Sequence, residues 1–240
     1  MDALFTVEVI SQTPNPQQVS YAAMHQDYAE QLVWDGRDHW PPEAKCGELL
    51  VKHLLQGNRG HYGPLEHPQI VLNFGYFPHS TMQQMRTHRN VSFDVQSFRY
   101  TGQRILDVVE GKQEVEEVFY LRPMGTYADR QGKKYDYTEQ QRQQDLDWCL
   151  QACHRYAERI NQGLSEEHAR GLIPFDVRQH WVMSANARSL MHLLDIRGKY
   201  DVQQETRELT ELMFVKFQQW MPEVASWYEK ARWRKGTLAP

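Results

Sequence analysis

The stretch Gln69-Ile70-Val71-Leu72-Asn73-Phe74-Gly75-Tyr76-Phe77 decides the fold of this chain. Its apolar side chains fall on both faces of an extended segment, which is typical of a strand in the middle of a sheet. The loop before it, residues 60–68, is rich in glycine and proline, and Ser80 or Thr81 can cap a short helix that runs through Arg86. We therefore expect a central strand that positions a polar loop at one end and a helix at the other.

The remaining elements are predicted from periodicity and turn residues. Residues 138–162 form the clearest helix, because apolar side chains recur there at helical spacing. After a break at Pro174, the segment 181–197 is taken as one element, and no boundary between a strand and a helix is predicted inside it. We also expect strands at residues 4–10 and 117–121, an extended segment at 93–99, and helices at 16–32, 42–56, 201–220 and 223–233.

Composition and charge bound the class of protein. A length of 240 residues with 40% hydrophobic residues suits one domain over residues 1–240. The net charge of −4 creates no overall field toward nucleic acid or a membrane, so neither is expected as a partner. Cys46, Cys149 and Cys153 lack CxxC spacing and are odd in number, which favours a reducing compartment. Since no apolar run approaches a membrane span and the N-terminus lacks the basic start of a signal peptide, we expect a cytoplasmic protein.

The stretch of residues 85–100 is too polar for a core element. If residues 93–99 are extended, Ser97 and Arg99 point the same way, and a hydroxyl beside a guanidinium is a natural seat for a phosphate. His88 and Arg89 add a flat ring and a second guanidinium, which suit a larger ligand with a pyrophosphate and a planar heterocycle. Residue types alone leave two interpretations open, a nucleotide site and a solvated basic loop.

Three ordered motifs carry a family resemblance. His88-Arg89, seven residues, then Ser97-Phe98-Arg99-Tyr100 resembles the signature of the flavin-dependent thymidylate synthases, written Arg-His-Arg-x7-Ser and followed by x-Arg-Tyr. Residues 63–67, Gly-Pro-Leu-Glu-His, are similar to the family's Thr-Pro-Phe-Glu-His element, and residues 186–191, Asn-Ala-Arg-Ser-Leu-Met, match its third element outright. The resemblance is good from about residue 60 to residue 200.

The resemblance implies an α/β (α+β) fold in which helices flank a central, mostly antiparallel sheet. It also implies a homotetramer with FAD at the subunit junctions. The family methylates C5 of dUMP to give dTMP, with methylenetetrahydrofolate as the carbon donor and NADPH as the reductant of the flavin. The expected partners are therefore small-molecule nucleotide and folate substrates.

Carried over by position, the resemblance assigns roles to individual residues. The residues expected to face FAD are His67, His88, Arg89, Asn186, Arg188 and His192. Those expected to face dUMP are Gln84, Ser97, Arg99, Arg170 and Arg197. Arg197 is also the expected catalytic residue, because a permanent charge can stabilise negative charge on the pyrimidine carbonyl side.

The reaction that the resemblance implies needs no cysteine nucleophile, and none of the three cysteines lies in the signature. Ser97 is assigned to substrate binding, since no base stands in an obvious relation to it. On a helix from residue 189 onward, Arg188 and His192 lie about 40° apart, whereas Arg197 is roughly 180° from Arg188. One helix would thus present flavin groups on one side and a nucleotide group on the other, which favours sites shared between subunits.

The chain departs from the family pattern at a few positions. Thr87 replaces the first arginine of the signature, and Arg86 cannot simply take its place, because one residue along a helix turns the side chain by about 100°. Val95 stands where the family commonly has glutamate, and His192 where it has asparagine. The loss at Thr87 puts one cofactor or nucleotide contact in doubt.

Other interpretations of the motifs remain open. His61, Glu66 and His67 could hold a metal, but no fourth ligand has convincing spacing, so no metal is expected. Cys149 and Cys153 lie on the apolar stripe of a helix and are expected in the core. For the function, the alternatives are a C5-methylase of UMP or another uridine nucleotide on the same fold, and a flavin- or nucleotide-binding protein that has lost catalysis.

Overall fold

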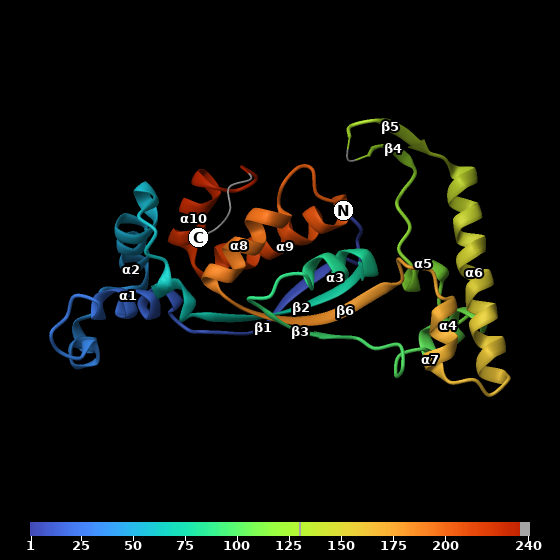
Figure 1. The fold of residues 1–240 in the computed structure, drawn as a ribbon, viewed down its shortest axis with the longest axis horizontal. Helices are drawn as coiled ribbons and strands as arrows, with labels where there is room; N and C mark the ends of the chain where they lie inside the picture. Colours follow the sequence, from blue (N-terminus) through green and yellow to red (C-terminus); the bar gives the residue numbers. More distant parts are fainter. Residues whose placement is uncertain (130, 236–240) are drawn as a thin grey trace.

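A four-stranded antiparallel sheet forms the centre of the computed structural model, which describes residues 1–129 and 131–235. The strand order is β1 (Thr6–Gln12), β2 (Gln69–Pro78), β6 (Arg178–Asn186) and β3 (Ser92–Val95). Helices pack on this sheet and at its ends (Figure 1). The predicted α+β architecture and the central place of residues 69–77 are therefore confirmed.

The core lies on one side of the sheet. Ile70, Leu72 and Phe74 of β2 are fully buried, whereas Asn73 between them is exposed. The Phe74 ring stacks on Trp181 of β6, with ring centroids 4.9 Å apart. The first half of β2 thus buries one face, and the prediction of two apolar faces applies only to its second half, where Phe77 and Pro78 are both buried.

Three C-terminal helices cover this buried side (Figure 1). They are α8 (Ala187–Arg197), α9 (Gln204–Trp220) and α10 (Pro222–Ala231). The last two confirm the helices expected from residues 201 and 223. The segment 181–197 is divided, because its first half belongs to β6 and its second half to α8.

Two further helices, α1 (Pro16–Gln26) and α2 (Glu43–Leu50), stand beside one end of the sheet (Figure 1). The expected helix 16–32 is wrong after Gln26, where α1 ends. The Gln26 side chain folds back on the following loop, where its oxygen accepts the Val33 N–H at 2.9 Å. Turns of 3-10 or π geometry complete this region at Val33–His39, Val51–Leu55, Gln56–Asn58 and Gly63–Glu66.

A second, smaller core lies at the other end of the molecule (Figure 1). Its helices are α4 (Gln103–Val109), α5 (Val115–Val118), α6 (Glu139–Asn161) and α7 (Glu166–Ala169), with a 3-10 turn at Arg170–Leu172 and a hairpin of β4 (Gly125–Ala128) and β5 (Lys134–Tyr137). The predicted helix 138–162 is confirmed, and Thr138 and Gln141 form a capping box at its start.

The expected strand 117–121 is wrong. Glu114 and Glu117 form a capping box that starts α5, so residues 115–118 are helical. Only Phe119 makes a strand-like bridge, to Val177. None of the helices in the described ranges combines the length and the apolar surface that a bilayer crossing requires.

Candidate functional site

Two helices bring the signature residues together from opposite ends of the sheet. Helix α3 (His79–Met85) starts where β2 ends, and α8 starts where β6 ends. Because β2 and β6 are antiparallel, the C-terminal ends of the two strands lie at opposite ends of the sheet. Both helices lie on the same side of it (Figure 1). The C-terminal end of α8 thereby reaches the residues that follow α3.

Arg197, the last residue of α8, contacts the signature directly. Its Nε donates to Nε2 of His88 at 2.9 Å, and its Nη2 donates to the Thr87 hydroxyl at 2.6 Å. The His88 ring also meets His192 edge to face, with centroids 6.0 Å apart. Three of the residues expected in the site, Arg197, His88 and His192, therefore converge.

His88 is neutral in this arrangement. Burial, then the charge of Arg197, then His192, lower the pKa of His88 to about 4. Since Nε2 accepts the hydrogen bond from Arg197, the ring proton lies on Nδ1. The guanidinium of Arg197 is thus the fixed positive charge of the cluster.

A hollow of about 320 Å³ adjoins this cluster, and we call it the smaller hollow. It holds His88, Arg89 and His192, which is half of the residues expected to face FAD. The residues that line it are Thr87, His88, Arg89, Asn90, Val91, Ser189, His192 and Ile196.

The other residues expected to face FAD lie at the start of α8. The Asn186 side chain caps the helix, because its Oδ1 accepts the Ser189 N–H at 2.7 Å. Arg188 forms an ion pair with Glu66. His67, the residue after Glu66, is exposed. These three expected residues do not line the smaller hollow of the same protomer.

A hollow of about 590 Å³, the larger hollow, lies between β3 and the turn at Arg170–Leu172. It brings together Ser97 and Arg170, two of the residues expected to face dUMP, and Arg86 joins them. Its lining is His79, Met82, Arg86, Phe93, Asp94, Val95, Gln96, Ser97, Phe98, Arg170, Gly171, Ile173, Pro174, Phe175, Val177 and Gln179.

Arg99 is positioned differently from the sequence expectation. Strand β3 ends at Val95, and residues 98–100 form a turn closed by the Tyr100 N–H and the Ser97 carbonyl at 3.0 Å. The predicted extended segment 93–99 is therefore wrong in its second half, and alternation cannot align Ser97 with Arg99. Arg99 is exposed and pairs with Glu167 at 2.6 Å.

Gln84 is held by α9 instead of lining either hollow. Its Nε2 donates to Gln203 at 2.5 Å, and its oxygen accepts the Thr206 hydroxyl at 3.3 Å. Gln203 in turn donates to Ser80 and to Glu205. Helix α3 is thereby tied to the start of α9.

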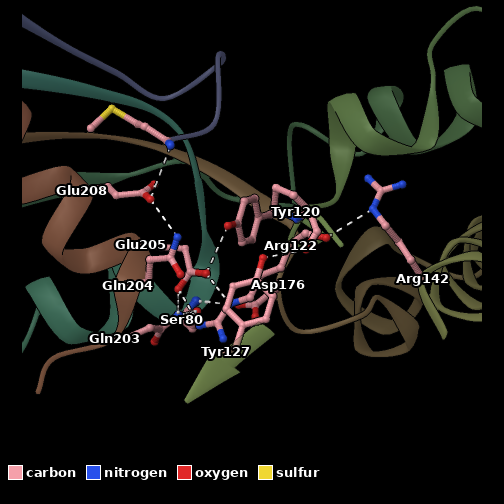
Figure 2. A network of polar contacts seen from close by, with 12 residues as sticks. Ser80, Tyr120, Arg122, Tyr127, Arg142, Asp176, Gln203, Gln204, Glu205 and Glu208 are labelled. Carbon is pink, nitrogen blue, oxygen red and sulfur yellow. Dashed lines mark hydrogen bonds and ion pairs between the residues drawn. The ribbon is translucent and has the colours of Figure 1, made fainter. Parts of the chain in front are cut away.

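Glu205 is the centre of this polar network, and sequence reasoning missed it (Figure 2). Its side chain is 1% exposed. Its carboxylate accepts hydrogen bonds from two nitrogens of Arg122, at 2.6 and 3.1 Å, and from the Tyr120 hydroxyl at 3.1 Å. Hydrogen bonds from Arg122 and Gln203 hold the pKa of Glu205 below its usual value despite burial. Arg122 and Tyr120 lie more than 80 residues from Glu205 in the chain, so no local pattern could indicate these two contacts.

The cysteines confirm the expectation of core positions. Cys149 and Cys153 are 3% and 0% exposed and belong to the smaller core, and Cys46 is buried in α2. Burial raises the pKa of Cys46 and of Cys149 to about 11 and that of Cys153 to about 12, so all three remain thiols. None of them lines either hollow.

Comparison with known proteins agrees with these motifs. Residues 8–223 match the family model Thy1, described as "Thymidylate synthase complementing protein". The chain is 32% identical to the flavin-dependent thymidylate synthase of Halobacterium salinarum over 98% of this chain and 99% of that protein. The flavin-dependent thymidylate synthase of Haloarcula marismortui shows the same identity and coverage.

Solved structures share the fold. The UMP/dUMP methylase PolB from Streptomyces cacaoi, bound with 5-Br dUMP, has a TM-score of 0.72 at 22% identity and covers 98% of this chain and 97% of its own. Thymidylate Synthase X from Helicobacter pylori, with FAD and dUMP, has a TM-score of 0.64 at 17% identity, over 88% and 92% of the two chains. The chain therefore belongs to the Thy1 family of flavin-dependent thymidylate synthases, which are methyltransferases.

Proposed function

We propose that this protein converts dUMP to dTMP by reductive methylation at C5, with FAD, NADPH and methylenetetrahydrofolate. One observation carries the proposal: the signature reaches both hollows, since Ser97 and Arg86, the residue just before the signature, line the larger one and the first signature positions line the smaller one. Arg86 lines the larger hollow, and Thr87 and His88 line the smaller one. A substrate held in one hollow would thus lie next to a cofactor held in the other.

The side chains of the smaller hollow suit a flavin nucleotide. Arg89 offers a charge for a pyrophosphate, and the His88 and His192 rings offer flat surfaces beside it. Reduced FAD bound there would supply the hydride that, with the methylene group of the folate, makes the methyl group of dTMP. NADPH restores the reduced flavin, so two electrons and one carbon are accounted for.

The larger hollow suits the nucleotide. Ser97 and Arg170 provide a hydroxyl and a guanidinium for the phosphate. Arg99 can join them by releasing Glu167, since both side chains of that ion pair are about half exposed and such a pair contributes roughly 0–1 kcal/mol. We assign Arg197 to the pyrimidine carbonyl side, where its fixed charge stabilises developing negative charge.

The residues expected to face FAD occupy separate places in one protomer. His88, Arg89 and His192 line the smaller hollow together with Ser189 of the first turn of α8, whereas Asn186 and Arg188 beside Ser189 do not line it. We propose that a homotetramer with shared sites, as the family resemblance implies, brings residues of a second protomer to the flavin. The buried thiols are compatible with the proposed cytoplasmic location.

The test is tritium release from 5-tritiated dUMP, run in parallel with 5-tritiated UMP, with and without methylenetetrahydrofolate. We expect release from dUMP that depends on FAD and on the folate. Release from UMP alone would favour a methylase of ribonucleotides, the alternative that includes UMP. No release from either nucleotide by flavin-loaded protein would leave only a binding protein and defeat the proposal.

A further inference from the structure

The floor of the larger hollow contains amide groups that lack partners within the described protein. Gln179 of β6 is 1% exposed, and its Oε1 is buried without a hydrogen bond. Gln96, just after β3, also has a buried and unpartnered Oε1. Both residues line the larger hollow together with Ser97 and Arg170.

Adjacent chain segments of the sheet bring the backbones of these two residues close together. Val95 pairs with Trp181, and the Gln96 N–H then donates to the His180 carbonyl at 2.9 Å. Gln96 therefore lies beside the backbone of His180, the neighbour of Gln179. The sheet thus fixes the backbone positions from which both side chains line the larger hollow.

An unpartnered buried amide is costly for a ligand-free protein. Leaving a buried polar group unsatisfied costs about 1–3 kcal/mol, and more than nine in ten buried polar groups in proteins have partners. Gln17 shows how a buried glutamine of this protein meets the rule. Gln17, which is 0% exposed, donates to Glu43 and Glu223 and accepts the Val224 N–H. Three of the eleven unpartnered buried atoms in the described residues, Nδ1 of His79 and Oε1 of Gln96 and of Gln179, belong to residues that line the larger hollow.

We propose that Gln179 and Gln96 are specificity-determining residues whose amides hydrogen-bond to the ribosyl-uracil part of the nucleotide in the larger hollow. This rests on the proposed function. Either polar end of an amide can turn toward the ligand, because the terminal torsion of glutamine is broad and roughly two-fold. The nucleotide offers matching groups, the N3–H and carbonyls of uracil and the hydroxyls of the sugar. A site that hydrogen-bonds such groups rejects analogues that lack them.

The role predicts opposite changes in stability and binding. Gln179→Met removes the unpartnered amide and keeps a side chain of similar length. We expect the ligand-free variant to unfold at a temperature equal to or above that of the wild type. Its dissociation constant for dUMP should rise roughly five- to tenfold, since one hydrogen bond contributes about 1 kcal/mol. Gln17→Met, the matched control, should unfold at a lower temperature and bind dUMP as the wild type does.

The experiment is thermal unfolding of the ligand-free proteins and calorimetric titration with dUMP, UMP and N3-methyl-dUMP. Discrimination against N3-methyl-dUMP, or between UMP and dUMP, that is lost in Gln179→Met or in Gln96→Met identifies the group that each amide binds. Wild-type affinity for all three ligands in both variants would overturn the inference, and so would weaker binding accompanied by the stability loss of Gln17→Met. Failure of the wild type to bind any of the three would instead count against the proposed function.

Discussion

Thr87 stands where the family signature has arginine. Hydrogen bonds fix the orientation of its hydroxyl group. The proton goes to the Gln84 carbonyl at 2.8 Å, so the oxygen lone pairs are left to accept Nη2 of Arg197 at 2.6 Å. Because α9 holds the Gln84 side chain, the position of that carbonyl is fixed as well. Thr87 therefore orients Arg197 without adding a second positive charge.

Thr87→Val should weaken dUMP binding about fivefold, because Arg197 loses one charge-assisted hydrogen bond. Thr87→Ser keeps the hydroxyl and should bind within about twofold of the wild type. The matched control is Thr210→Val, since the Thr210 hydroxyl also donates to a carbonyl three residues back, that of Arg207 at 2.7 Å, but lies away from both hollows. Calorimetry that gives equal dUMP affinity for Thr87→Val and Thr210→Val would contradict this role.

The ionisation of His88 should make stability depend on pH. Its pKa is about 4 in the folded protein and near the ordinary value of 6.5 when unfolded, so folding favours the neutral ring. The stability that this contributes is present above pH 6.5 and is lost as the pH falls toward 4. Between pH 7 and 4.5, the wild type should lose about 2 kcal/mol more than His88→Gln, as measured by urea unfolding. His39→Gln, which removes an exposed histidine, should lose as much as the wild type; identical losses in His88→Gln and the wild type would refute the assignment.

At the level of single residues, the sequence motifs predicted several residues that the structure gathers in two hollows, but not all of the groups found there. His88, Arg89 and Ser97 belong to one short motif, and Arg170 was assigned from the family resemblance; all four line one of the two hollows. The unpartnered amide of Gln179 was not predictable, since its environment depends on β3 pairing with β6. Arg99 shows the limit of a local rule, because a turn at residues 98–100 replaces the expected strand.

Among the elements, the contact of α9 with the segment before the hairpin rests on the Glu205–Arg122 ion pair (Figure 2). Glu205→Gln leaves Arg122 without its counter-charge, and we expect a loss of about 2 kcal/mol or more in urea unfolding. Glu8→Gln is the control, since Glu8 pairs with Lys216 at 2.9 Å with its side chain 66% exposed. That exposed pair should contribute less than about 1 kcal/mol. Equal losses in the two variants would show that burial adds nothing to the Glu205 pair.

Elements were predictable where one local signal dominated. The apolar run of β2 and the stripe and capping box of α6 each indicate one structure, and both predictions are confirmed. Sequence reasoning did not separate β6 from α8, because Asn186 ends the strand and caps the helix without an intervening breaker. Residues 117–121 have strand-forming side chains, but the capping box at Glu114 starts a helix first.

At the scale of the whole molecule, the proposed shared site requires association. Light scattering after gel filtration should give the mass of four chains of 28.4 kDa each. Because each site would draw residues from two protomers, flavin binding and methylation should fall together when the protein is diluted into monomers. A monomer with full activity at the assay concentration would contradict shared sites.

The central claim is that this protein methylates a uridine nucleotide by means of a flavin, with the two ligands bound in the neighbouring hollows. No cysteine nucleophile takes part. The most direct measurement is mass spectrometry of the nucleotide product after the flavin has been removed from the protein and then restored. With dUMP, NADPH and methylenetetrahydrofolate, we predict dTMP from the FAD-restored protein and none from the flavin-free protein. Formation of dTMP without flavin, or its absence after FAD has bound, would contradict the account.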